Sequence, residues 1–206
     1  MNNTNSLFIT ATNTDIGKTY ASELFLKYYA NKGLKVGYFK PIETGVTDLP
    51  IDGNKMLNLV KKLNPDFNVS IDDVVPYQFE LPAAPYVAKK DSKIDIHLII
   101  KKKEYLESLC DILIIEGAGG LLVPIEKDFF IIDLIKKLQI KTILVCPSRL
   151  GSINDSLLSM EALKNREIDF DWYINLYEDK KNFEDVSLPF YKDYFKTIKF
   201  LDELKH

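Results

Sequence analysis

Short apolar runs, separated by stretches long enough for a helix, narrow the fold of this chain more than any other feature. The five runs cover residues 7–11, 36–39, 112–115, 142–146 and 172–175. Strands that are apolar on both faces and alternate with helices are typical of a parallel sheet covered by helices. No repeat, low-complexity tract or linker divides the 206 residues. The sequence therefore predicts one α/β domain over residues 1–206, with a mostly parallel central sheet and helices on both faces.

Between these runs, apolar residues recur at helical spacing. They do so in residues 20–31, which Gly33 follows as a C-terminal cap, and the other predicted helices are 57–63, 96–109, 131–138 and 153–163. Residues 44–54 are polar and turn-rich, and residues 79–95 are interrupted by prolines, so both are predicted to be loops. Loops at the carboxyl ends of parallel strands form the ligand crevice of open α/β sheets. We therefore expect substrate-contacting groups in these loops.

The charge balance gives little reason to expect nucleic acid or a membrane as a partner. The formal net charge is -3 and the pI is near 5.5, so any phosphate site has to be local. No apolar stretch approaches the roughly 20 residues that span a bilayer, and the N-terminus lacks the features of a secretion signal. Cys110 and Cys146 lie in or beside apolar runs and are predicted to be buried free thiols. These features favour a cytoplasmic protein.

Residues 7–25, LFITATNTDIGKTYASELF, place an apolar run directly before Gly17-Lys18-Thr19. This strand-loop-helix order is typical of a P-loop, whose backbone N–H groups hold phosphate oxygens. The Lys18 ammonium can span phosphates, and the Thr19 hydroxyl can bind Mg²⁺. The usual spacing also asks for glycine at position 12, where this chain has Thr12. The alternative, a helix that simply begins at Gly17 with a surface lysine, agrees less well with the preceding apolar run.

A second candidate group follows the run 36–39, in GYFKPIETG. A lysine at this position, Lys40, can stabilise a transferring phosphoryl group or a carboxylated intermediate if a P-loop lies on the adjacent strand. A solvated lysine is an equally good interpretation of this stretch alone. Thr44 in the same loop offers a hydroxyl to a substrate or only makes the turn.

A third group ends the run 112–115, in DILIIEGAGGLLVP. Glu116 occupies the place where P-loop enzymes put a second metal ligand, and an acidic residue after four apolar ones is costly to bury without a cation. The glycines after it allow a ligand to approach the backbone closely or only form a tight turn. Further along, Gly151 and Ser152 precede a predicted helix whose first N–H groups can hold an anion. Capping of that helix by Ser152 or Asn154 is compatible with this role.

Four segments in this order, TATNTDIGKT, YFKPIETG, IIEGAGGLLVP and LGSIND, resemble the dethiobiotin synthetase family of P-loop enzymes, over about residues 6–175. The resemblance implies that 7,8-diaminopelargonic acid, CO2 and MgATP give dethiobiotin, ADP and phosphate. An amine forms a carbamate, ATP phosphorylates it, and the second amine closes a cyclic urea. The resemblance also implies a homodimer with the active site at its interface.

The resemblance assigns a role to each matching residue. Its catalytic residues are Lys18 and Lys40. Its nucleotide-binding residues are Asp15, Ile16, Gly17, Lys18, Thr19, Tyr20, Asp52, Glu116, Gly117, Ala118, Gly119 and Asn175. Its substrate-binding residues are Thr14, Lys40, Thr44, Gly119 and, from the partner subunit, Gly151, Ser152, Ile153 and Asn154. Mg²⁺ is assigned to Thr19, Asp52 and Glu116, with Asn54 competing for the place of Asp52.

The chain departs from the family near the C-terminus. Asn175 is followed by Leu176 where relatives have an Asn-Asp-type pair, and the tail lacks their proline pattern, which predicts weak selection of adenine. A MinD/ParA-like regulatory ATPase is the main alternative, although that class has a lysine early in its loop where this chain has Thr12-Asn13-Thr14. A non-catalytic nucleotide-binding module is a second alternative. It gives no reason for Lys18, Thr19, Lys40 and Glu116 to occur together.

Overall fold

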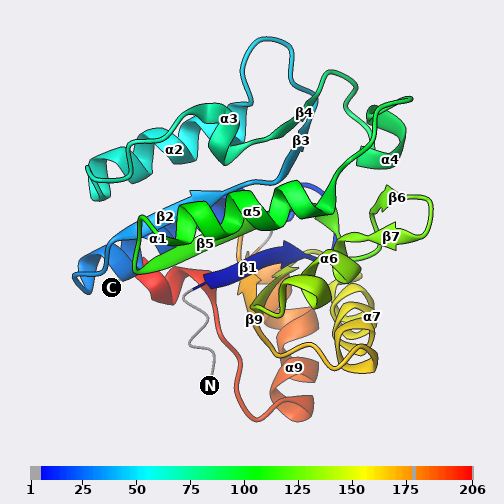
Figure 1. Ribbon diagram of the computed structural model, residues 1–206. Helices are drawn as coiled ribbons and strands as arrows, with labels where there is room; N and C mark the ends of the chain where they lie inside the picture. The colour runs from blue at the N-terminus through cyan, green and yellow to red at the C-terminus, as the bar shows by residue number, and fades with distance from the viewer. Residues whose placement is uncertain (1–5, 178–179, 206) are drawn as a thin grey trace.

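The computed structural model describes residues 6–177 and 180–205, and its centre is a parallel sheet of five strands (Figure 1). The strand order is β2-β5-β1-β8-β9, and every neighbouring pair is parallel. The strands are β1 (Ser6–Ala11), β2 (Val36–Phe39), β5 (Ile112–Gly120), β8 (Lys141–Pro147) and β9 (Phe170–Asn175). All five predicted strands are confirmed. Strand β5 continues past the predicted end because Gly120 resumes the pairing with Ala11 of β1 after an irregularity.

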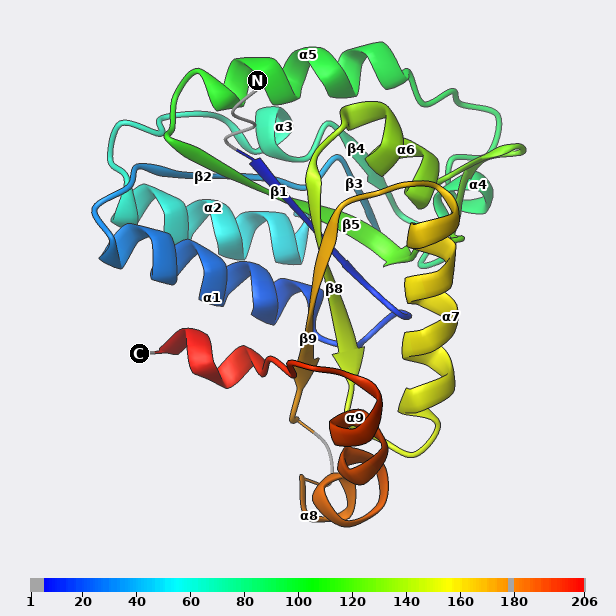
Figure 2. The ribbon, with the colours of Figure 1, turned by 90° about the horizontal axis from the view of Figure 1, so that it is seen from below.

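Helices cover both faces of this sheet, as the sequence predicts (Figure 2). Helix α1 (Lys18–Asn31) and the C-terminal 3-10 segment η2 (Leu201–Lys205) pack against each other on one side, and α2 (Ile51–Leu63) packs beside α1. The opposite side carries α5 (Ile96–Glu107), α6 (Ile131–Leu138) and α7 (Ser152–Asn165). The shorter helices are α3 (Ile71–Val74), α4 (Pro85–Ala88), α8 (Lys180–Asn182), the π-helical η1 (Phe183–Ser187) and α9 (Leu188–Tyr194). None of the helices in the described part of the chain is long and apolar enough to cross a membrane.

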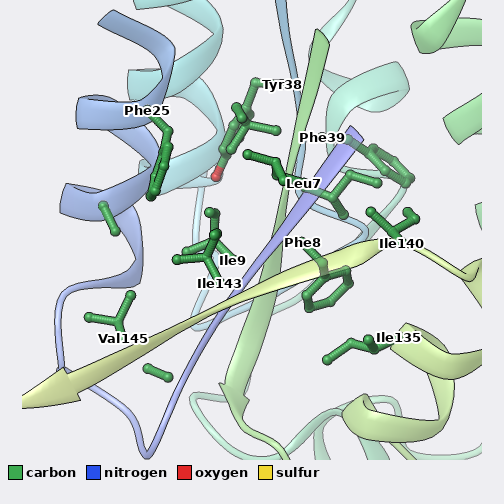
Figure 3. Close-up of a cluster of buried hydrophobic side chains, with 14 of the residues drawn as sticks. Leu7, Phe8, Ile9, Phe25, Tyr38, Phe39, Ile135, Ile140, Ile143 and Val145 are labelled. Atoms are coloured by element: carbon green, nitrogen blue, oxygen red, sulfur yellow. The ribbon is translucent and has the colours of Figure 1, made fainter. Parts of the chain in front are cut away.

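The core forms because successive residues of β1 point to opposite faces of the sheet (Figure 3). Phe8 points toward Ile135 of α6, whereas Ile9 points toward Phe25 of α1. Phe8 and Ile9 are both fully buried. Tyr38 of β2 is also fully buried and brings its hydroxyl oxygen into this apolar layer. The sheet is therefore packed on both faces, and polar groups are left to its strand ends.

The two predicted loops contain helical segments. Residues 44–54 end inside α2, which begins at Ile51 rather than at residue 57, because the turn-like Asp52-Gly53 pair forms the first turn of the helix. Residues 79–95 contain the short helix α4, with Pro85 in its first turn, where proline is tolerated. Two small sheets were also missed, because their strands have three residues or fewer: β3 (Ile42–Thr44) with β4 (Tyr77–Phe79), and β6 (Pro124–Glu126) with β7 (Phe129–Phe130).

Both cysteines are free thiols, as predicted. Cys146 is buried, and burial raises the pKa of its thiol to about 12. Cys110 is only partly buried, so the expectation of burial holds for one of the two.

Candidate active site

A cleft of about 650 Å³ opens at the carboxyl ends of β1, β2 and β5. This is where ligands bind in open α/β sheets. Three segments that the sequence singles out contribute to its wall, together with part of the proline-rich loop. The lining residues are Thr14, Asp15, Gly17, Lys18, Thr19, Lys40, Ile42, Glu43, Thr44, Asp52, residues 82–85, Glu116, Gly117, Ala118, Gly119 and Val123.

The loop between β1 and α1 does not need the glycine that the usual P-loop spacing asks for. Thr12 has no left-handed backbone, and its N–H donates to the carbonyl of Val145 at 3.1 Å. Gly17 does need to be glycine. Its φ is 100°, and a Cβ there would lie 2.3 Å from the Asn175 amide nitrogen, which donates to the carbonyl of Ile16. The loop is thus held at its C-terminal end, directly before α1.

Lys18 begins α1 and lies across this loop. Its ammonium donates to the main-chain carbonyl of Asn13 at 3.2 Å, and the residue is 9% exposed. Burial lowers the pKa of Lys18, and the nearby Glu116 carboxylate opposes that effect. No side chain caps the N-terminus of α1. Its first N–H groups and the Lys18 ammonium therefore form an environment suited to phosphate oxygens.

Glu116 is fully buried and accepts four hydrogen bonds. Its Oε1 accepts from Thr19 at 2.8 Å and from the Lys40 ammonium at 2.9 Å. Its Oε2 accepts from Ser22 at 2.7 Å and from Tyr38 at 2.9 Å. Burial, followed by the charge of Glu116, raises the pKa of Tyr38 well above its ordinary value, so the phenol remains a donor. The buried carboxylate thus has both a cation and a full set of donors.

Lys40 lies between two carboxylates and is not a solvated surface lysine. Its Nζ is 2.5 Å from Asp52 Oδ2 and 2.9 Å from Glu116 Oε1, and the residue is 5% exposed. Burial alone would lower the pKa of Lys40, but Glu116 and then Asp52 outweigh it, so the pKa lies above its ordinary value. Lys40 therefore carries a charge at neutral pH. Its position joins the ends of β2 and β5 to the first turn of α2.

Asp52, rather than Asn54, faces this cluster. Asp52 lines the cleft, whereas the amide oxygen of Asn54 accepts from Asn58 one turn further along α2. Thr19, Asp52 and Glu116 provide a hydroxyl and two carboxylates, which are the hard oxygen donors that Mg²⁺ prefers. The described residues hold no group of three His, Cys, Asp or Glu side chains that could bind a metal ion by themselves. The donor set fits Mg²⁺ held by one or two carboxylates together with substrate phosphates.

Several residues assigned by resemblance do not line the cleft of a single chain. The Ile16 side chain is buried, and the Asn175 amide donates to the Ile16 carbonyl. The Tyr20 hydroxyl donates to Asp202 of η2. Residues 151–154 form the start of α7, outside the cleft. Glu43 is a cleft residue that the sequence analysis did not single out. The sequence held no signal for it, because the helix was predicted to begin only at residue 57, whereas α2 begins at Ile51 with Pro50 in the capping position.

The parallel sheet, the P-loop and the buried lysine beside it define a nucleotide-binding protein of the P-loop class. Comparison with known proteins narrows this class. A family model described as an AAA domain matches residues 5–173. The ATP-dependent dethiobiotin synthetase BioD of Sulfurovum sp. is 54% identical over 92% of this chain and 91% of its own length. The ATP-dependent dethiobiotin synthetase BioD of Wolinella succinogenes is 40% identical over 91% of this chain and 88% of its own length. The chain belongs to the dethiobiotin synthetase family.

Solved structures with the same fold are more distant. The MinD cell division protein of Aquifex aeolicus superimposes with a TM-score of 0.56 over 94% of this chain and 79% of its own, at 18% identity. A plasmid partition protein of Borrelia burgdorferi superimposes with a TM-score of 0.59 over 97% of this chain and 94% of its own, at 13% identity. These matches show that the chain shares its fold with a cell division protein and a plasmid partition protein. They carry no argument about activity.

Proposed function

We propose that this protein forms the cyclic urea of dethiobiotin from 7,8-diaminopelargonic acid, CO2 and ATP. One amine of the substrate adds to CO2 and loses a proton to give a carbamate. The carbamate oxygen attacks the γ-phosphorus of ATP and releases ADP. The second amine then attacks the carbonyl carbon, and phosphate leaves as the ring closes. The observation that best supports this chemistry is the position of Lys40, a buried cation at the end of a strand beside the P-loop.

Each charged group in the cleft suits one part of this reaction. The Lys18 ammonium and the N-terminus of α1 bind the phosphates. Lys40 stabilises the carbamate and then the charge that builds up on the transferring phosphoryl group. Thr19, Asp52 and Glu116 would hold Mg²⁺, which when bound neutralises phosphate charge. Lys40 is within reach of both carboxylates, so it also keeps them from repelling each other.

The diamine is assigned to the other side of the cleft. Thr14, Thr44 and Gly119 line it and offer hydroxyl and backbone groups to the amines or the carbamate. Asp15 lines it as well and attracts an ammonium group of the substrate. Phosphate release by the purified protein tests the proposal, because it should require both the diamine and bicarbonate. We place this activity in the cytoplasm, where ATP and Mg²⁺ are supplied.

We assign the far end of the substrate to a second copy of the chain. The N-terminus of α7, residues 151–154, has no side-chain cap and does not face the cleft of its own chain. Near it, Leu122 and Leu158 are each 58% exposed and line one apolar hollow of about 260 Å³. Exposed apolar surface of this kind is typical of an interface between proteins. A homodimer would cover it and bring an uncapped helix N-terminus to the substrate carboxylate.

Hybrid dimers test this shared site. Ser152 is fully buried, so the test substitution is better placed at the exposed Asn154. We expect Lys40→Ala and Asn154→Trp to be inactive as separate dimers and to regain activity after mixing, because one site of each hybrid contains neither change. Activity is measured after subunit exchange has been shown with labelled chains. If exchange occurs between folded dimers and no activity returns, the partner does not supply residues 151–154.

Nucleotide selection is expected to be weak. The P-loop holds phosphates without contacting the base, and the Asn175 amide nitrogen already donates to the carbonyl of Ile16. A site that lacks buried polar groups matched to adenine has little means of rejecting other bases. We therefore expect ATP to work, with less preference over GTP and CTP than relatives show. Calorimetric titration with each triphosphate, Mg²⁺ and the diamine measures this, and strong preference for ATP alone would contradict it.

A further inference from the structure

We propose that Glu43 is a positioning residue that fixes Asp52 beside Lys40 by capping the N-terminus of α2. The inference rests on the proposed function, since it takes Asp52 as the metal-side carboxylate. Glu43 lies on β3, lines the cleft and is 7% exposed. Within the part of the chain that the structure describes, Glu43 forms no hydrogen bond or ion pair with the triphosphate-binding loop, so its effect is expected to pass through Asp52.

The contacts of Glu43 are those of a helix cap supplied by a separate element. Its Oε1 accepts from the main-chain N–H of Asp52 at 3.0 Å, and its Oε2 accepts from that of Gly53 at 2.9 Å. The residue in the ordinary capping position is Pro50, whose side chain has no oxygen to accept these bonds. A carboxylate at this end of a helix also interacts favourably with the helix dipole. Glu43 thus satisfies two N–H groups that the local sequence leaves without partners.

This cap fixes the backbone of the residue whose side chain reaches Lys40. The Asp52 side chain is 40% exposed, so packing alone holds it weakly. Its main-chain N–H is bound by Glu43, and its carboxylate is bound by the Lys40 ammonium at 2.5 Å. Without Glu43 the first turn of α2 would be free to fray. The Asp52 carboxylate would then lose its fixed direction toward the cleft.

The local sequence is built to allow this cap. A Cβ on Gly53 would lie 2.2 Å from Val75 Cγ2 and 3.2 Å from Glu43 Oε2, so only glycine lets both neighbours approach α2 this closely. Burial raises the pKa of Glu43, while Lys40 and the N–H groups of Gly53 and Asp52 pull it down. The charged form of the Glu43 carboxylate is thus stabilised by Lys40 and by the same two N–H groups that it caps.

Calorimetric affinity for the ATP analogue AMPPNP, measured with and without Mg²⁺, separates a positioning role from a merely structural one. The ratio of the two affinities is the gain due to Mg²⁺. The variants are Glu43→Ala, Asp52→Ala and the double variant, with Glu43→Gln as a near-isosteric second substitution that should give a smaller loss in the same direction. Asp95→Ala is the matched control, because Asp95 caps α5 through the N–H of His97 and does not line the cleft.

We expect Glu43→Ala to lower the Mg²⁺-dependent gain about tenfold, as is usual for groups that orient a metal ligand, and to leave Mg²⁺-free affinity unchanged. The loss should disappear in the Asp52→Ala background, because the two residues act as one unit. Asp95→Ala should keep the full gain.

If Asp52→Ala loses the gain and neither Glu43 variant does, the positioning role is wrong and the metal role of Asp52 stands. If the Glu43 effect persists without Asp52, the positioning role is also wrong. If neither residue matters, both assignments fail.

Discussion

Lys40→Ala is expected to lower kcat by about a hundredfold or more, because it removes a preorganised charge from where the phosphoryl charge develops. The ammonium lies 2.9 Å from Glu116 and 2.5 Å from Asp52, so the substitution removes the positive charge that contacts both carboxylates. The substitution also leaves Glu116 buried without its cation, which typically costs on the order of 3–5 kcal/mol of stability. Steady-state kinetics and urea unfolding measure the two effects separately.

The hydroxyls of Thr19, Ser22 and Tyr38 still donate to Glu116 in this variant, so we expect it to remain folded. Lys35→Ala is the matched control. Lys35 pairs with Asp66 at an exposed position outside the cleft, and its loss should leave kcat unchanged. Near-normal turnover in folded Lys40→Ala would remove Lys40 from the mechanism.

Lys18→Ala is expected to lower turnover by a similar factor, about a hundredfold, and also to weaken binding of the triphosphate. The expected cost to stability is smaller than for Lys40→Ala. In the described part of the chain Lys18 donates to the Asn13 carbonyl and forms no salt bridge, so no buried carboxylate loses its counterion. Calorimetry with AMPPNP and single-turnover kinetics give the binding and chemical effects.

Lys27→Ala provides the control on the same helix. Lys27 lies on α1, pairs with Glu23 and is exposed, so its removal changes the charge of the helix without touching the cleft. A Lys18→Ala variant that binds and turns over ATP as the parent protein does would show that α1 and its loop hold phosphate without this side chain.

The central sheet could be predicted from the sequence because its strands are buried on both faces. Such strands appear as continuous apolar runs, and all five were found. Parallel topology then places the polar residues that follow each strand at one edge. This is why Lys18, Lys40 and Glu116, which are far apart in the sequence, could be expected to meet.

Contacts between separate short segments could not be predicted. The Asp52-Gly53 pair looks like a turn, and it becomes the first turn of α2 only because Glu43 caps it from β3. The choice between Asp52 and Asn54 depends on the same contact. The C-terminal region depends on packing between aromatic rings, such as Trp172 on Tyr191, which leaves no periodic pattern in the sequence.

The product formed from 7,8-diaminopelargonic acid, ¹³C-bicarbonate and MgATP tests the proposed function most directly. Mass spectrometry of the reaction should show dethiobiotin with one ¹³C in its ring carbonyl, together with one phosphate released for each product molecule. Lys40→Ala protein should form the labelled product about a hundredfold more slowly under the same conditions. Phosphate release at the same rate with and without the diamine, and no labelled cyclic urea, would contradict the proposal and favour a regulatory ATPase.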